Sequence, residues 1–261
     1  MLDPKHALLL TAAHNLDYAM TFDPYVRRSP PAAVAAGLVP AGAPTLGTTS
    51  IYAVLSDVQP ALVAYSWWRD NSDVALMLVE LPDDPDHVFD ARLPIDTRDT
   101  IPMGTEVTAV GFPDIHGEFI EPPDYENAKF RVRLSTKFEG RGGRVVGTAT
   151  PHGIHRGGGV LVDCAFAFGM SGGPLLENRN GRAIVRAVVS ADLDGQDAED
   201  SSMSARAFAG LLLPALSIKA DNLTLETETR GVLNDPFLLD IVGASLIEDL
   251  GESDKHVRLV E

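Results

Sequence analysis

The sequence predicts an all-β fold on three observations. Apolar or alternating runs of strand length recur along most of the chain. Glycine and proline clusters separate these runs, and no segment with helical periodicity lies between them. A chain with many short strands and no intervening helices favours β-barrels or a β-sandwich.

The expected strands follow one another from the N-terminus to the middle of the chain. They are residues 7–11, 51–55, 61–65, 74–79, 106–110, 130–134, 159–164 and 184–189. Residues 29–47 are rich in proline, alanine and glycine and are expected to form an extended loop.

The C-terminal part has a different pattern. Residues 204–216 contain alanine, leucine and phenylalanine without β-branched side chains, which predicts a helix that ends near Pro214. Residues 235–250 predict a second helix, with Asp235 as its N-cap and Pro236 at its first position. Between them, residues 222–232 (NLTLETETRGV) partly alternate and predict an added strand.

Composition and charge narrow the classes of partner. The formal net charge of −16 disfavours binding to phosphate backbones and anionic membranes, so neither nucleic acid nor membrane is expected as a partner. The single cysteine, Cys164, allows no intrachain disulfide. No signal-peptide pattern and no run of roughly 20 apolar residues is found, so a cytoplasmic location is expected. The scattered histidines have no spacing that assures a metal site, so neither a metal nor another cofactor is expected.

Three short motifs carry the candidate chemistry. TAAH ends an expected strand at His14, SDVAL opens another around Asp73, and GMSGGP surrounds Ser171. Each motif alone is compatible with a structural role. Together and in this order they predict a catalytic triad, because a serine hydroxyl needs a base to become a nucleophile and the base needs an orienting carboxylate.

These motifs resemble the three motif segments of the trypsin-like serine peptidases of the chymotrypsin fold. The resemblance extends to EVTAVGFP at 106–113 and AVVS at 187–190, and it is greatest to the cysteine-poor bacterial members. It implies a serine endopeptidase that acts through an acyl-enzyme on peptide or protein substrates. It also implies two antiparallel β-barrels of the six-stranded type, the first over residues 1–98 and the second over 99–217. A C-terminal helix and tail are expected over 218–261.

The resemblance also implies an oxyanion hole and a substrate-binding strand. The backbone amides of Gly169 and Ser171 match the donors of the oxyanion hole. Ser190 matches a serine that lies beside the triad aspartate and begins the pairing with the substrate backbone, although a plain role at a strand end fits equally well. Ala191 and Asp192 continue this segment and are expected to contact substrate.

The specificity pocket is expected to be uncharged. Ala165 lies six residues before Ser171, where trypsin-like members place the residue that selects a charge. A small or apolar side chain is therefore expected before the scissile bond. Asp192 is either a surface acid or a pocket residue that favours basic side chains.

One departure from the family concerns the first barrel. His14 lies close to the start of the given sequence, so this barrel is expected to lack its N-terminal strands. Such a gap exposes a sheet edge that another chain, or the tail after Leu216, is expected to cover. A second departure is Met170, which stands where zymogen-type members have an aspartate, so activation through that ion pair is not expected.

Two alternative functions remain open at this point. The first is an inactive binding module of the same fold, because an incomplete first barrel would hold His14 and Asp73 loosely. The second is an esterase of the α/β-hydrolase fold, since residues 169–173 also match its GxSxG motif. That fold places a helix directly after the serine, whereas Gly172, Gly173 and Pro174 are poor helix formers.

Overall fold

The computed structural model describes most of the chain in separate segments. These are residues 6–16, 52–54, 60–69, 72–80, 93–98, 100–113, 116–120, 132–135, 137–149, 157–192, 206–221, 223–227, 231–241, 247–249 and 255–257. The expected loop at 29–47 lies outside them. The described elements are nearly all strands, so the predicted all-β class is confirmed.

One half of the molecule is a closed antiparallel barrel with the strand order β10-β11-β12-β9-β8-β5. Its strands are β5 (Glu106–Gly111), β8 (Glu139–Ala149), β9 (Gly159–Val162), β10 (Pro174–Arg179), β11 (Arg182–Asp192) and β12 (Ala207–Leu211). Side chains alternate along β5 between exposed and buried, as expected of a strand with one face in a core. Valines, leucines and alanines from these strands fill the interior of the barrel.

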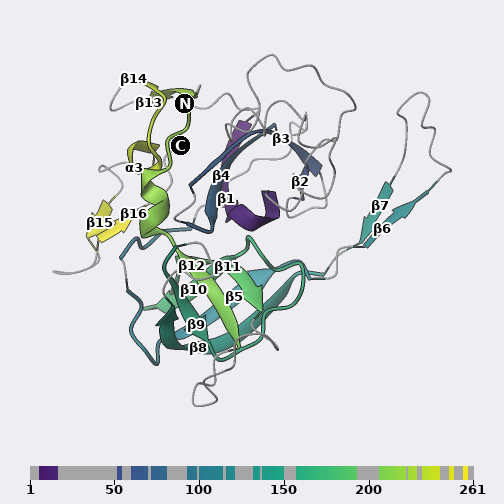
Figure 1. Ribbon diagram of the computed structural model, residues 1–261, viewed down its shortest axis with the longest axis vertical. Coiled ribbons are helices and arrows are strands. Elements are labelled where there is room, and N and C mark those ends of the chain that lie inside the picture. The colour runs from purple at the N-terminus through teal and green to yellow at the C-terminus, as the bar shows by residue number, and fades with distance from the viewer. Residues whose placement is uncertain are drawn as a thin grey trace.

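The other half contains an antiparallel four-stranded sheet in the order β1-β4-β3-β2. Its strands are β1 (His6–Ala12), β2 (Tyr52–Val54), β3 (Pro60–Trp68) and β4 (Val74–Glu80). The sheet lies above the barrel in Figure 1, and a helical turn over residues 13–16 follows β1 at the junction of the two halves. Within the described residues these strands do not close into a barrel, so only one of the two expected barrels is observed.

The segment between the two halves is fixed to β11. Ile95 forms an isolated parallel bridge with Val185, Asp96 N–H donates to the Val185 carbonyl at 2.9 Å, and Val185 N–H donates to the Pro94 carbonyl at 2.8 Å. The chain therefore enters the barrel along the strand that carries Ser190.

The helix predicted over residues 204–216 is wrong. Residues 207–211 form β12, whose side chains are all buried between β11 and β9, and only the 3₁₀ helix η2 (Leu213–Ser217) follows. Pairing on both sides and complete burial outweigh the modest helix propensity of alanine and leucine in this segment.

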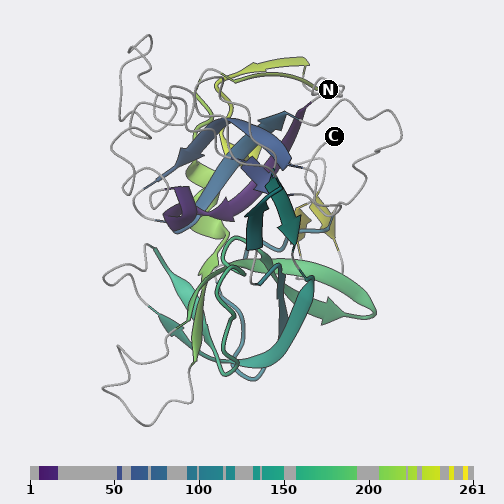
Figure 2. The same cartoon turned by 90° about the vertical axis from the view of Figure 1, so that its right-hand side faces the viewer.

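The C-terminal segment packs against the four-stranded sheet, as Figures 1 and 2 show. Trp67 of β3 donates its indole N–H to the Asp221 carbonyl at 3.0 Å. Buried apolar side chains of this segment share a core cluster with Trp67, Val74 and Leu76 of the sheet; they are Ile218, Ala220, Leu223, Leu238 and Ile241. The described part of the tail therefore docks on the protein, as expected, through contacts with β3 and β4, whereas its expected cover of the sheet edge stays a prediction.

The form of the tail differs from the prediction in two ways. The strand expected at 222–232 becomes β13 (Thr224–Thr227), which pairs with β14 (Gly231–Asn234) in a separate hairpin and does not extend the sheet. Within the described part of residues 235–250, the expected helix is observed only as α3 (Leu238–Ile241), and residues 247–249 form a strand, β15 (Ile247–Asp249). Asp235 has a φ of 46°, a left-handed conformation that suits a turn after β14 and not an N-cap.

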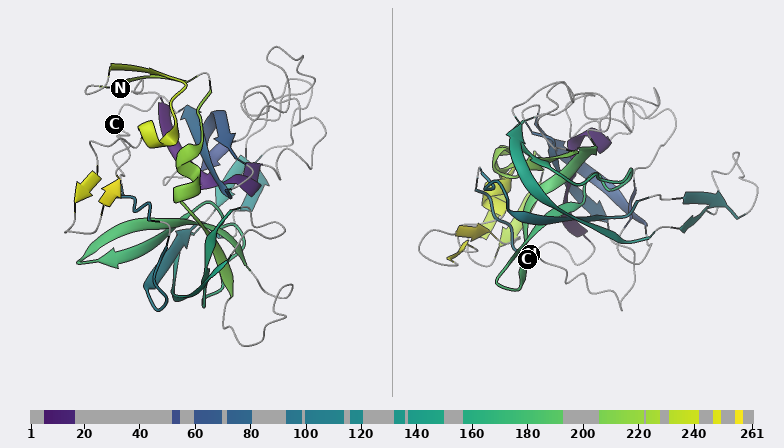
Figure 3. Two further views of the ribbon diagram at one scale, coloured as in Figure 1. Left: turned by 60° about the vertical axis from the view of Figure 1, so that its left-hand side comes forward. Right: turned by 90° about the horizontal axis from the view of Figure 1, so that it is seen from below.

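Two small hairpins complete the described elements. β6 (His116–Phe119) pairs with β7 (Val132–Ser135), and β15 pairs with β16 (Lys255–Val257). Figure 3 shows the β6–β7 hairpin standing away from the barrel. No helix within the described residues is both long and apolar enough to cross a membrane.

Candidate active site

The candidate base and its carboxylate come from neighbouring strands of the four-stranded sheet. β1 pairs with β4 so that Ala12 lies opposite Val74, which places His14 just beyond the end of β1 and Asp73 just before β4. Ser72 accepts a hydrogen bond from the Val74 N–H at 3.1 Å, which stabilises the turn that presents Asp73.

Asp73 holds His14 through two hydrogen bonds. The His14 backbone N–H donates to Oδ1 of Asp73 at 3.0 Å, and His14 Nδ1 lies 2.8 Å from Oδ2. The Asp73 side chain is fully buried, whereas the His14 side chain is 36% exposed. A buried carboxylate fixes both the backbone and the ring of the histidine, and the other ring nitrogen, Nε2, remains for a reacting group.

Ser190 supplies a third donor to the same carboxylate. Its hydroxyl, on β11, donates to Oδ2 of Asp73, and the Ser190 side chain is buried. The register of β11 on β12 shifts between Val189 and Ala191, so Ser190 is the extra residue of a β-bulge. A bulge turns a side chain away from its regular direction. The sequence resemblance placed Ser190 beside Asp73, and the observed contact agrees with that interpretation.

Ser171 lies in a tight loop between Phe166 and β10. Met170 N–H donates to the Ala167 carbonyl at 3.0 Å, and Gly173 N–H donates to the Met170 carbonyl at 3.0 Å. Gly169 and Gly172, on either side, have φ values of 90° and 94°, which few other residues adopt. These two glycines of the motif therefore permit the double turn that carries Ser171.

The Ser171 hydroxyl donates to the backbone carbonyl of Ser190 at 2.6 Å. Within the described part of the chain, no hydrogen bond joins it to His14. Ser190 therefore connects the three candidate residues: its hydroxyl contacts Asp73 and its carbonyl accepts from Ser171.

The two expected oxyanion donors are unengaged. Neither the Gly169 amide nor the Ser171 amide donates a hydrogen bond to any residue that the structure describes. Stabilisation of an oxyanion requires amide donors that are available beside the nucleophile, so the role of these two amides stays a prediction. Sequence reasoning named both residues from the resemblance alone.

The structure describes the backbone of the three residues that were expected to contact substrate, Ala165, Ala191 and Asp192. Ala165 is partly buried, and its carbonyl accepts a hydrogen bond from Nη1 of Arg141 at 3.2 Å. Ala191 and Asp192 continue β11 and pair with Phe208 and Ala207 of β12. No group of three or more metal-binding side chains occurs within the described residues, and His152 and His155 lie outside them.

One residue of the site was missed by the sequence analysis. Asn15 follows His14 in the helical turn, and its side-chain Nδ2 donates to the Ser171 carbonyl at 2.9 Å. No local sequence pattern predicts this contact, because Asn15 and Ser171 are 156 positions apart in the chain.

Comparison with known proteins gives structural neighbours only. No family model and no curated protein matches the sequence. The HtrA-type protease AlgW with a decapeptide is similar in structure, with 16% identity and a TM-score of 0.42, over 83% of this chain and 48% of that chain. An inactive form of Rv3671c from M. tuberculosis shows 15% identity and a TM-score of 0.40, over 81% of this chain and 72% of that chain. This chain therefore matches about half the length of the AlgW chain.

Proposed function

We propose that this protein is a serine endopeptidase in which Ser171 is the nucleophile, His14 the general base and Asp73 the orienting carboxylate. The observation that carries the proposal is the hydrogen-bond chain through one buried carboxylate. Asp73 accepts from His14 Nδ1 and from Ser190, whose carbonyl in turn accepts from Ser171. A fully buried carboxylate with several donors suits a charge that must persist while a neighbouring histidine gains and loses a proton.

The proposed reaction has two stages. The Ser171 hydroxyl turns from the Ser190 carbonyl to His14, gives its proton to Nε2, and attacks the carbonyl carbon of the substrate. The negative oxygen that forms is stabilised by the amides of Gly169 and Ser171. His14 then protonates the leaving amine, which departs and leaves an acyl-enzyme on Ser171. A water molecule, deprotonated by His14, attacks the acyl carbon and releases the second product, and the proton returns to Ser171.

The substrate is proposed to be a peptide that binds in extended form beside residues 190–192 of β11. An extended peptide gains affinity from backbone hydrogen bonds and specificity from pockets for its side chains. Ala165 brings no charge to the proposed pocket, so small or apolar side chains before the scissile bond should be preferred. If Asp192 instead lines the pocket, a library of peptides will show a preference for arginine or lysine.

A binding module without activity is the second candidate, because the Ser171 hydroxyl contacts Ser190 and not His14. An α/β-hydrolase is disfavoured, since β10, and not a helix, follows Ser171 and the long elements of the described residues are strands.

The test of the proposed function is covalent labelling with a fluorophosphonate, combined with peptide-library cleavage. We expect labelling and cleavage by the wild type, and loss of both in Ser171→Ala and His14→Ala with unchanged folding. Ser135→Ala, at an exposed serine of β7, is the matched control and should behave as the wild type. A folded wild type that neither reacts nor cleaves would favour the binding module, and cleavage by purified Ser171→Ala would refute the assignment of the nucleophile.

A further inference from the structure

Asn15 forms a hydrogen bond between the two halves of the molecule at the candidate active site. It lies in the helical turn next to His14, on the half that contains the four-stranded sheet. Its Nδ2 donates to the carbonyl oxygen of Ser171, in the barrel half, at 2.9 Å. A carbonyl oxygen only accepts hydrogen bonds, so the amide nitrogen of Asn15, and not its oxygen, must face Ser171.

The same peptide unit is held from the opposite side. The Gly172 N–H, which shares a peptide plane with the Ser171 carbonyl, donates to the Val189 carbonyl of β11 at 2.8 Å. Because a peptide unit is planar, one hydrogen bond at its oxygen and another at its nitrogen fix the orientation of the plane. The Asn15 and Val189 contacts therefore limit ψ of Ser171 and φ of Gly172 together.

Close packing brings this peptide against β1. A Cβ atom built on Gly172 would lie 2.3 Å from Oγ1 of Thr11 and 3.1 Å from Nδ2 of Asn15. The loop that carries Ser171 thus rests directly on the end of β1 and on the turn that carries His14.

His14 is fixed independently of this loop. Its backbone and ring are both bound to Asp73, on the sheet half, so the base has a set position relative to β1 and β4. Ser171 belongs to the other half, and its side chain is connected to Asp73 through Ser190. Asn15 adds a constraint on the Ser171 backbone, within one residue of the base.

We propose that Asn15 is a positioning residue that sets the backbone of Ser171 against His14. The inference rests on the proposed function, because it concerns the distance between nucleophile and base. Its effect should appear in the chemical step and not in substrate binding. A displacement of about 1 Å between reacting groups lowers rates on the order of 10²-fold.

The test compares Asn15→Asp and Asn15→Ala with a matched control, Asn178→Asp. Asn15→Asp keeps the size of the side chain but replaces the donor with an acceptor that repels the Ser171 carbonyl. Asn178→Asp makes the same change of charge at the β10–β11 turn, where Oδ1 of Asn178 accepts from Gly181 N–H at 3.0 Å and an aspartate can do the same. We expect both Asn15 variants to lose about 10- to 100-fold in kcat with KM changed less than about twofold. The control should match the wild type.

Hydrogen exchange provides a readout that does not require hydrolysis. In both Asn15 variants the hydrogen-bonded amides of Gly172 and Gly173 should exchange faster, while the β5 and β8 amides keep wild-type rates. Unchanged kcat and unchanged loop exchange would overturn the inference, as would faster exchange throughout the barrel, which indicates a merely structural role. A wild type that fails to hydrolyse or to label would refute the proposed function alone, and loop exchange would still decide whether Asn15 holds the Ser171 peptide.

Discussion

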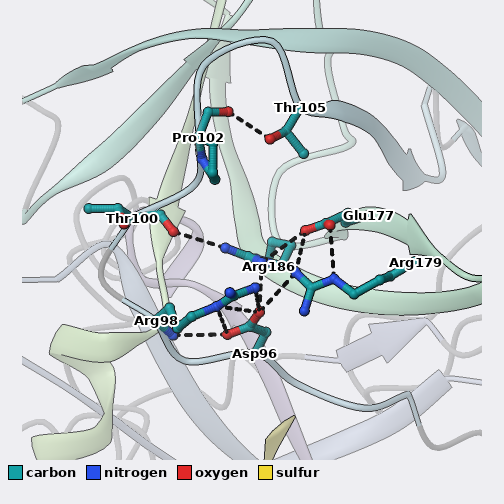
Figure 4. A network of polar contacts seen from close by, with 8 residues as sticks. All are labelled: Asp96, Arg98, Thr100, Pro102, Thr105, Glu177, Arg179 and Arg186. Carbon is teal, nitrogen blue, oxygen red and sulfur yellow. Dashed lines mark hydrogen bonds and ion pairs between the residues drawn. The ribbon is translucent and has the colours of Figure 1, made fainter. Parts of the chain in front are cut away.

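Asp96 and Arg186 form a buried ion pair at the point where the chain enters the barrel. Nη1 of Arg186 lies 2.6 Å from Oδ2 of Asp96 and 2.8 Å from Oε2 of Glu177, and Nη2 donates to the Thr100 carbonyl at 2.9 Å (Figure 4). Arg98 and Arg179 also contact the Asp96 carboxylate. Both members of the central pair have fully buried side chains, so their charges depend on each other.

The Asp96 carboxyl should make stability depend on acid pH. Burial acts to raise the pKa of Asp96, but hydrogen bonds from Arg98 and the charge of Arg186 outweigh it and hold the pKa below its ordinary value. Because the pKa of Asp96 is lower in the folded state, its ionised carboxylate stabilises the fold at any pH above the unfolded-state pKa of about 3.9. This stabilisation is lost as the pH falls through the folded-state pKa.

We therefore expect Asp96→Asn to lower the free energy of unfolding by about 3 kcal/mol at pH 7, since it leaves Arg186 with an incomplete partner. The difference from the wild type, measured by urea unfolding, should shrink as the pH falls below about 3.9 toward the depressed folded pKa of Asp96. Asp221→Asn, at an exposed residue paired with Lys219, is the control and should change stability by less than about 1 kcal/mol. An equal effect of the two substitutions would contradict the prediction.

Gly172 is the second single residue with a measurable role. Its φ of 94° is strained for any other residue, and a Cβ would collide with Thr11. Gly172→Ala should lower the free energy of unfolding by about 2–4 kcal/mol, from strain and overpacking together, and should abolish labelling of Ser171. Gly181 also has a positive φ, but a Cβ atom there would meet no other atom within 4 Å. Gly181→Ala should therefore lower the free energy of unfolding only by the cost of backbone strain. Equal losses in thermal melts of the two variants would exclude the collision.

Among the larger elements, the C-terminal segment contributes to the core of the sheet half. Leu238 of α3 is buried in the cluster that contains Trp67 and Val74, whereas its neighbour Leu239 is 53% exposed. Leu238→Ala should lower the free energy of unfolding by about 2–5 kcal/mol, and Leu239→Ala by less than about 0.5 kcal/mol. Chemical denaturation measures both. Similar small effects of the two substitutions would show that the tail contributes little to the fold.

For the molecule as a whole, the two halves share one core cluster. Val188 of β11 and Ile95 of the connecting segment pack with Val74 and Leu76 of the sheet half. Because this packing joins the sheet to the barrel, we expect both to unfold in a single transition. Trp67 and Trp68 fluorescence reports the sheet, and hydrogen exchange of β5 and β8 reports the barrel. Urea midpoints that differ between the two probes would show independent folding of the halves.

Local pattern was sufficient to predict several of the strands around the candidate site, although β8 and β10 were not among the expected strands. β1, β4, β5 and β11 read as apolar or alternating runs, and each was predicted near its observed bounds. The short motifs also predicted the candidate residues of the site. They could do so because each is a local feature: a serine among glycines, and a histidine or an aspartate at a strand end. The assignment of His14, Asp73 and Ser171 as a triad remains the prediction that the labelling experiment tests.

Other features depended on contacts between distant parts of the chain. β12 has a helix-like composition but forms a strand because β9 and β11 pair with both of its edges. The tail forms a hairpin because it folds against the sheet, and the Asn15–Ser171 and Asp96–Arg186 contacts join residues far apart in sequence. Local propensities amount to a fraction of a kcal/mol per residue, whereas burial and pairing with distant strands contribute several kcal/mol. The tertiary structure alone therefore decided which of these segments became strands and which polar groups met.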